Sequence, residues 1–278
     1  MRAERGFTLV ELVMVIVIGS ILAMVSVRFI ASSMQGVVDT AGRQQMAMTI
    51  ALVSERISRE LRQALPNSVR IYDPDSDSEN ECIEFVPVRA ASRYSGSLAG
   101  STVTRLNVMS PGAVKGFVSV YPITDTSVYP NGSTSTVSPG EIDFSDNLDC
   151  PANGDMLACS GYEDGTGISQ AFPFDSPQKR FFVTGQPVSF CRGIIGGESF
   201  LLRYFDYGFQ GIAGNGITTT ACPAATCQVV TNHISRLEFS YSAASLSRSA
   251  VVTFLVELVN DQNETLSLNQ QVQVRNVP

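Results

Sequence analysis

One carboxylate, Glu11, lies inside an otherwise uncharged apolar run at residues 7–27. At about 1.5 Å of rise per helical residue, this run is long enough to cross the ~30 Å hydrocarbon core of a bilayer. A charge inside a membrane helix costs on the order of a few kcal/mol, so such a residue needs a partner. The nearest charged side chain in the sequence is Arg5, outside the run. The run therefore predicts a membrane-spanning helix whose carboxylate has a pairing role.

Two ordinary interpretations of this segment leave features unexplained. A secretory signal peptide has an apolar core of about 7–15 residues followed by a small-residue cleavage site. This run is longer and passes directly into helix-compatible sequence. A plain signal anchor fits the length but has no use for Glu11. In either case Arg2 and Arg5 predict a cytoplasmic N-terminus, because positive charges flanking a membrane helix stay in the cytoplasm.

The segment GFTLVE at residues 6–11, preceded by a short basic leader, resembles the class III signal of type IV prepilins and pseudopilins. The resemblance implies that a prepilin peptidase cleaves between Gly6 and Phe7 and that the new N-terminal residue, Phe7, is methylated. It also implies that Glu11 pairs with the free amine of Phe7 on a neighbouring subunit. Such pairing neutralises two charges that are each costly alone in an apolar environment. Where major pilins often carry a proline, this chain has Arg28, so no kink is expected there.

The C-terminal half carries a looser resemblance, to the heads of MshO-type minor pilins of mannose-sensitive haemagglutinin pili. It is also more loosely similar to PilW-type minor pilins and pseudopilin J. The similar segments are RFFVTGQPVSFC at 180–191, LLRYFDYGF at 201–209 and VRNVP at 274–278. The resemblance implies a non-enzymatic minor pilin that acts in pilus assembly, in initiation or at the filament tip. The alternatives are a type II secretion pseudopilin and an adhesive or ligand-binding tip subunit.

The same resemblance implies partners and a location. The expected partners are the inner membrane, the prepilin peptidase, and the other major and minor pilins of the filament. The expected location is the bacterial inner membrane, with one membrane pass, a cytoplasmic N-terminus and a periplasmic head that later reaches the cell surface. Nucleic acid is not expected as a partner, because the net charge is −7 and the sequence shows no basic stripe.

The helical pattern continues beyond the membrane run. One apolar stripe recurs at spacings of three and four residues, the period of one helix face. Opposite charges at Glu55/Arg59 and Arg56/Glu60 are spaced to pair along the helix. Pro66 ends the pattern, so one helix is predicted over residues 7–65. The stripe consists of Met46, Ile50, Val53, Ile57, Leu61 and Ala64.

Residues 66–278 are predicted to form a β-rich head. Runs rich in Val, Ile, Phe, Tyr and Thr recur, and nothing resembles a β–α–β unit. The last three runs predict an antiparallel meander, with a turn at residues 260–263. Residues 91–116 and 124–170 are poor in core residues, and the second stretch is predicted to be a surface insertion. The predicted strands are 83–88, 102–108, 117–121, 181–191, 200–209, 234–241, 251–259 and 266–274.

These elements define an α+β, pilin-like fold, in which a long N-terminal helix packs on an antiparallel β-sheet head. The expected divisions are a prepilin leader at 1–6, a transmembrane or filament-core half of the helix at 7–27, an amphipathic half at 28–65, and the extracytoplasmic head at 66–278. The apolar first half suits a bilayer or filament core, and the amphipathic second half suits packing against a sheet.

Six cysteines and a single histidine, His233, argue for disulfides rather than a metal or redox site, because no C-x-x-C pair is present. An even count suggests three disulfides in an oxidising compartment, with fifteen possible pairings. Short separations favour Cys150 with Cys159 and Cys222 with Cys227. This choice leaves Cys82 to pair with Cys191.

One acidic segment is a candidate cation site. Asp73, Asp75, Asp77 and Glu84 fall at oxygen-ligand positions of an EF-hand-like loop, and Ca²⁺ takes six to eight such oxygens. The sixth position is Ser78, where that loop needs glycine, and no helix follows. An acidic solvated loop is therefore the favoured interpretation, with no cofactor expected. The sequence also offers no acid, base and nucleophile constellation, so no catalytic activity is predicted.

Overall fold

The structure is a computed structural model, and it confirms an α+β architecture of one long helix and antiparallel sheets. The chain divides into two compact units, Met1–Met48 and Thr49–Pro278. The residues described are 8–74, 79–100, 102–103, 105–129, 135–146, 150–159, 171–243, 249–260 and 262–274.

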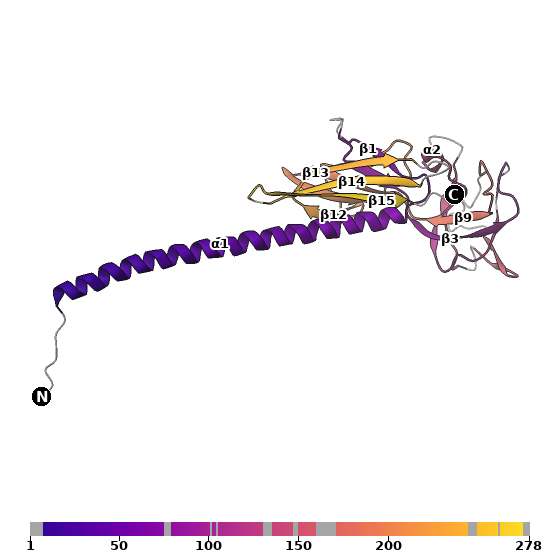
Figure 1. Ribbon diagram of the computed structural model, residues 1–278. Helices are drawn as coiled ribbons and strands as arrows, with labels where there is room; N and C mark the ends of the chain where they lie inside the picture. Colours follow the sequence, from indigo (N-terminus) through magenta and orange to yellow (C-terminus); the bar gives the residue numbers. More distant parts are fainter. Residues whose placement is uncertain are drawn as a thin grey trace. The chain divides into compact units, whose positions relative to one another are not determined.

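The helix α1 runs from Leu9 to Arg62 and is drawn in indigo to purple in Figure 1. Within the first unit its bulky apolar side chains are exposed, from Leu9 at 80% to Val38 at 62%. The apolar residues surround the helix instead of forming one stripe. An α-helix satisfies its own backbone hydrogen bonds, so this form is stable in lipid as well as in protein.

The last turns of α1 belong to the second unit and bury one face. Ile50, Val53, Ile57 and Leu61 are all 5% exposed or less, as the predicted stripe requires. On the neighbouring face Glu60 accepts hydrogen bonds from Arg203, with nitrogen–oxygen distances of 2.9–3.1 Å. The helix is thus fixed to the head by apolar burial and by one ion pair.

The helix ends at Arg62, three residues before the predicted end. The backbone of residues 63–65 leaves the helix to pair with the segment between two strands of the head. The Val88 N–H donates to the Gln63 carbonyl at 2.8 Å, and the Leu65 N–H donates to the Val86 carbonyl at 2.8 Å. Pro66 disfavours helical geometry in the residue before it. The backbone pairing of residues 63–65 with the head ends the helix at Arg62, earlier than the proline alone requires.

A five-stranded antiparallel sheet forms the middle of the head, in the order β1-β2-β10-β11-β12. The hairpin between β10 and β11 turns at Gly196 and Gly197, which have φ angles of 64° and 87°. Two left-handed residues make the tight turn typical of two-residue hairpins, and glycine adopts them without strain. The strands are β1 (Arg70–Tyr72), β2 (Cys82–Phe85), β10 (Val188–Ile195), β11 (Glu198–Tyr204) and β12 (Cys227–Asn232).

The predicted C-terminal meander is confirmed as a three-stranded sheet of β13 (Ile234–Ser242), β14 (Ala250–Val259) and β15 (Thr265–Val274). Burial alternates along β14, so that Val252, Phe254 and Val256 face the core. This alternation follows from the two-residue period of a strand with one covered face. Strand β13 lies against the strands of the five-stranded sheet.

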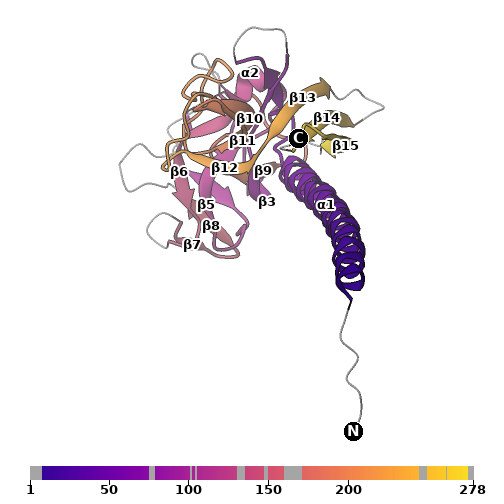
Figure 2. The same cartoon turned by 90° about the vertical axis from the view of Figure 1, so that its left-hand side faces the viewer.

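A third sheet has seven strands in the order β6-β5-β9-β3-β4-β8-β7. In Figures 1 and 2 its strands lie on a different side of the head from the meander. A short helix, α2 (Asp125–Val128), precedes β6. The strands are β3 (Val88–Ser95), β4 (Leu106–Val108), β5 (Lys115–Ser119), β6 (Val137–Asp143), β7 (Ala152–Asn153), β8 (Met156–Cys159) and β9 (Arg180–Thr184).

This sheet includes both stretches that the sequence marks as poor in core residues. Residues 91–116, with a strand predicted at 102–108, contain most of β3 and all of β4. Residues 124–170, predicted to be a surface insertion, instead contain α2, β6, β7 and β8. The second stretch also supplies the buried side chains of Tyr129, Ile142 and Phe144. Sparse apolar residues are enough there, because short strands hydrogen-bond to neighbours that already have a core face.

The run predicted as one strand at residues 181–191 is two strands in different sheets. Strand β9 ends at Thr184, and β10 starts at Val188. Pro187 has no N–H to donate to a ladder, and proline is excluded from strand interiors for that reason. The predicted strand 102–108 is likewise shorter, because β4 begins only at Leu106.

Candidate functional site

The N-terminal segment is the first candidate site. Gly6 and Phe7 lie outside the residues that the structure describes. The Thr8 hydroxyl accepts a hydrogen bond from the Glu11 N–H at 3.3 Å, and the Thr8 carbonyl accepts one from the Leu12 N–H at 3.2 Å. Thr8 therefore acts as the cap of α1, a position that threonine favours.

Glu11 lies in the first turn of α1 and is exposed. A carboxylate in the first turn is favoured by the positive end of the helix dipole. The apolar side chains that follow Glu11 are exposed as well. The arrangement presents one charge at the head of an apolar surface, so a partner from outside the chain can reach both.

The membrane-spanning prediction agrees with the helix composition. Helix α1 includes an 18-residue window with mean hydropathy 2.6 and no share of it buried. Its length and composition are sufficient to cross a bilayer, and the apolar window is not buried, unlike the last turns of the same helix. A membrane-anchored subunit fits these properties.

The three disulfides occur with the predicted pairing. Cys82 pairs with Cys191 across the adjacent strands β2 and β10, a sequence separation of 109 residues. The other two are local, with Cys150–Cys159 spanning 9 residues and Cys222–Cys227 spanning 5. The long bridge fixes the five-stranded sheet, and the short ones hold single loops.

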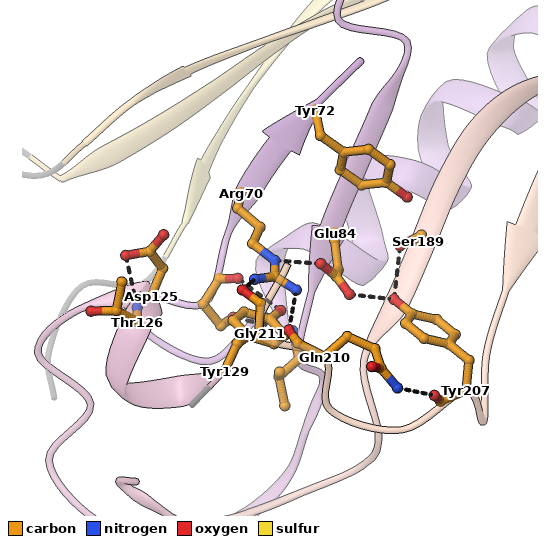
Figure 3. A network of polar contacts seen from close by, with 12 residues as sticks. Arg70, Tyr72, Glu84, Asp125, Thr126, Tyr129, Ser189, Tyr207, Gln210 and Gly211 are labelled. Atoms are coloured by element: carbon orange, nitrogen blue, oxygen red, sulfur yellow. Dashed lines mark hydrogen bonds and ion pairs between the residues drawn. The ribbon is translucent and has the colours of Figure 1, made fainter. Parts of the chain in front are cut away.

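A buried polar network occupies the open end of β1 and β2 (Figure 3). Arg70 and Glu84 lie opposite each other in the strand register and form an ion pair, with the Glu84 side chain fully buried. The remaining Arg70 nitrogens donate to the carbonyls of Gln210 at 2.7 Å and Gly211 at 3.1 Å. The second Glu84 oxygen accepts from the Tyr207 hydroxyl at 2.7 Å. Each Arg70 nitrogen and each Glu84 carboxylate oxygen therefore has a hydrogen-bond partner.

Aromatic rings surround this network. The Arg70 guanidinium lies 3.7 Å from the centroid of the Tyr129 ring, a cation–π contact. Burial raises the pKa of Tyr129 and of Tyr207 well above the usual value, and the nearby Glu84 carboxylate adds to both shifts. Both tyrosines therefore remain neutral hydrogen-bond donors. The network holds the segment after β11 against β1 and β2, which is a structural role.

The glycine-rich segment after β11, which this network holds, lies very close to Tyr72. Gly214 has a φ of 75°, and a Cβ there would lie 2.4 Å from Cε2 of Tyr72. Only glycine fits this position. The segment is a loop between β11 and β12.

The network also corrects the acidic cation-site hypothesis at one residue. Because Glu84 is held by Arg70 and Tyr207, it is not available as a ligand at the end of that loop. Asp75 and Asp77 lie outside the described residues. Within the described ranges, no group of three or more His, Cys, Asp or Glu could hold a metal ion.

His233 lies in the connection between β12 and β13, with a φ of 57°. Its carbonyl accepts a hydrogen bond from the Val259 N–H at 2.9 Å, and its side chain is exposed. The residue thus serves the turn between the two strands.

Sequence reasoning also missed a groove where four arginines meet. Arg59 and Arg62 come from the end of α1, Arg89 from β3 and Arg180 from β9. They belong to separate segments of the chain, so no sequence window shows them as a basic stripe. Only the fold brings them together.

Comparisons with known proteins support the N-terminal site. Residues 1–27 match the family model described as the prokaryotic N-terminal methylation motif, the signal of type IV pilins and pseudopilins. The match covers the predicted leader, Gly6, Phe7 and Glu11. No curated protein and no solved structure matches the chain. The chain therefore carries the processing signal of a type IV pilin-like or pseudopilin-like subunit.

Proposed function

We propose that this chain is a minor pilin of a type IV, MSHA-like pilus that acts in pilus assembly, in initiation or at the tip. The observation that carries the proposal is the methylation motif, joined directly to a helix whose apolar surface is uncovered. The apolar surface of such a helix is stable in a bilayer before assembly and against the helices of neighbouring subunits after it. The size of the head supports a minor rather than a repeating subunit.

In this proposal the prepilin peptidase cleaves between Gly6 and Phe7 on the cytoplasmic side of the inner membrane and methylates Phe7. The head lies in the periplasm, where its three disulfides form. On extraction into the filament, Glu11 pairs with the terminal amine of a neighbouring subunit. The chain acts as a structural subunit and not as an enzyme.

A type II secretion pseudopilin is the second candidate, because the methylation motif is common to pilins and pseudopilins. The two candidates differ in the filament that takes up the chain. The looser head similarity at residues 180–191 and 201–209 favours the pilus.

Deletion and complementation in a piliated host test the proposal. The gene is deleted, and wild-type, Gly6→Ala or Gly6→Val chains are supplied, with filaments counted by electron microscopy and sheared filaments probed for the chain. We expect wild type to restore filaments, Gly6→Ala to restore them slowly, and Gly6→Val to stay unprocessed and inactive, because bulk blocks the peptidase. Normal piliation in the deletion strain, with the wild-type chain absent from filaments, would overturn the proposal.

A further inference from the structure

The arginine groove is an open cavity of about 1390 Å³ in the head. Four arginines line it together with apolar residues that include Pro66, Val88, Ala91, Val114 and Phe182. Among the described residues that line it there is no aspartate or glutamate. Four positively charged side chains therefore lie together in a protein whose net charge is −7, with no carboxylate among the described lining residues to neutralise them.

The arginines of this groove have few partners within the chain. Arg89 donates to the Lys115 carbonyl at 2.7 Å, and Arg180 donates to the Gln178 side chain at 2.8 Å. Arg62 is 4.0 Å from Glu55, at the outer limit of an ion pair. None of these contacts is a close pair with a carboxylate, so most of the five N–H donors of each guanidinium remain for a ligand.

The strand register places Arg180 next to another arginine, which costs free energy. Arg93 lies directly opposite Arg180 across β3 and β9. Like charges in this position destabilise a sheet. Arginines at the end of α1 are favoured by the helix dipole, which accounts for Arg59 and Arg62. The dipole does not account for Arg89 and Arg180, which lie in strands. An anion bound at Arg180 would offset the repulsion between Arg180 and Arg93, which itself is not among the residues that line the groove.

An open strand edge runs along the same groove. The Val88 N–H bonds to Gln63, and the Arg93 carbonyl accepts from the Met109 N–H at 2.8 Å. Between these two points no strand of the described residues pairs with this side of β3. Because backbone groups alternate along a strand, the N–H and C=O of Ala91 face the same open side as the Arg93 carbonyl. Figures 1 and 2 show β3 and β9 beside the end of α1.

We propose that this groove binds an extended, acidic segment of a neighbouring pilin-class subunit. Carboxylates of the segment pair with Arg89, Arg180, Arg59 and Arg62, and its backbone adds to the open edge of β3. Arginine recognises carboxylates through paired N–H donors, and strand addition supplies main-chain affinity without sequence demands. The inference rests on the proposed function, because it takes the partner from the same filament.

Site-specific photocrosslinking in cells that make the filament tests this inference. A benzoylphenylalanine is placed at Ala91 in the full chain, and the crosslinked peptide is identified by mass spectrometry. The same probe is placed in an Arg89→Glu/Arg180→Glu chain and in an Arg105→Glu/Arg236→Glu chain. The second chain is a matched control, because both of its arginines are exposed outside the groove and its change in net charge is identical.

We expect an adduct with an acid-rich segment of a subunit that has an N-terminal methylation motif. Its yield should fall by about tenfold or more in the Arg89/Arg180 chain and remain in the control. Replacing the acids of the captured segment with lysine should restore the adduct to the Arg89/Arg180 chain.

Cleavage at Gly6 and incorporation are measured in every variant, so the two proposals fail differently. An unchanged adduct in the Arg89/Arg180 chain, with normal processing, would overturn the groove alone. An adduct with nucleic acid, lipid or a neutral peptide would overturn it as well. A charge-dependent adduct with a protein lacking the motif, from a chain that never enters filaments, would overturn both the partner and the proposed function.

Discussion

The two units of this chain differ in how they place their apolar side chains. Residues 9–48 of α1 carry exposed apolar side chains on all sides, whereas the head closes Phe85, Phe190 and Phe254 to 1% exposure or less. The head also has three disulfides and internal ion pairs, whereas Glu11 and Asp39 are exposed on residues 9–48 of the helix. The head buries its apolar core without a partner. The helix requires one.

This difference separates the expected effects of mutations. Changes in the head should alter its free energy of unfolding and leave N-terminal processing intact. Changes in the first unit should alter assembly and leave head stability unchanged.

Glu11→Ala should have the largest effect. Membrane insertion and cleavage should remain, but incorporation into filaments should fall by roughly tenfold or more, because the amine of a neighbouring Phe7 loses its partner in an apolar environment. Sheared filaments and membrane fractions are compared by immunoblot. Glu11→Asp, which keeps the charge, is the control. Normal incorporation of Glu11→Ala would remove the charge-pairing role.

Loss of the long disulfide should destabilise the head more than loss of a short one. The loop-entropy relation gives about 5 kcal/mol for the 109-residue separation of Cys82–Cys191 and about 2 kcal/mol for the 5-residue Cys222–Cys227. Each pair is replaced by alanines in the full chain, and urea unfolding in detergent is followed by circular dichroism. Equal losses would mean that the long bridge does not limit the unfolded chain.

Removing one partner of the buried ion pair should cost nearly as much. Arg70→Met leaves Glu84 charged and buried, which is expected to cost about 3–5 kcal/mol. Arg236→Met is the control, because its pair with Glu238 is exposed to solvent and contributes little to stability. Both are measured by the same urea unfolding. Similar small losses would show that the network of Figure 3 is not a determinant of head stability.

The smallest effect concerns pH. Burial alone would raise the pKa of Asp175, but hydrogen bonds from the Leu98 N–H, Ser97, Lys179 and Tyr94 outweigh it and hold the pKa well below the usual value. A lowered carboxyl pKa contributes stability above the unfolded value of about 3.9 and loses it as the pH falls further.

Asp175→Asn should therefore flatten the decline of head stability below about pH 4, with the melting temperature of both chains measured from pH 2 to 7. Parallel pH profiles for wild type and variant would contradict this assignment.

The sequence predicted the features that depend on local pattern. The apolar run, the buried stripe from Ile50, the C-terminal meander and the disulfides are all confirmed. Short strands such as β6 were missed, because their few apolar residues become a core only beside β5 and β9. The Arg70–Glu84 network was missed for a related reason. Its carbonyl acceptors, Gln210 and Gly211, lie far from Arg70 in the chain.

The groove arginines were missed because each is ordinary in its own segment. Arg59 and Arg62 lie at the predicted end of the helix, and Arg89 and Arg180 lie just outside the predicted strands 83–88 and 181–191. Their meeting depends on the early end of α1 at Arg62 and on the pairing of β3 with β9. Neither is encoded in a short window of sequence.

The most direct test of the central claim is the mass of the N-terminal peptide after co-expression with a prepilin peptidase. A chain that begins at N-methylated Phe7 is the predicted result, and it would establish cleavage after Gly6 with the apolar helix retained. An intact Met1 terminus under active peptidase would contradict the account and leave a plain signal anchor. A cut after Val27 would contradict it more strongly, because the head would then be secreted without the helix.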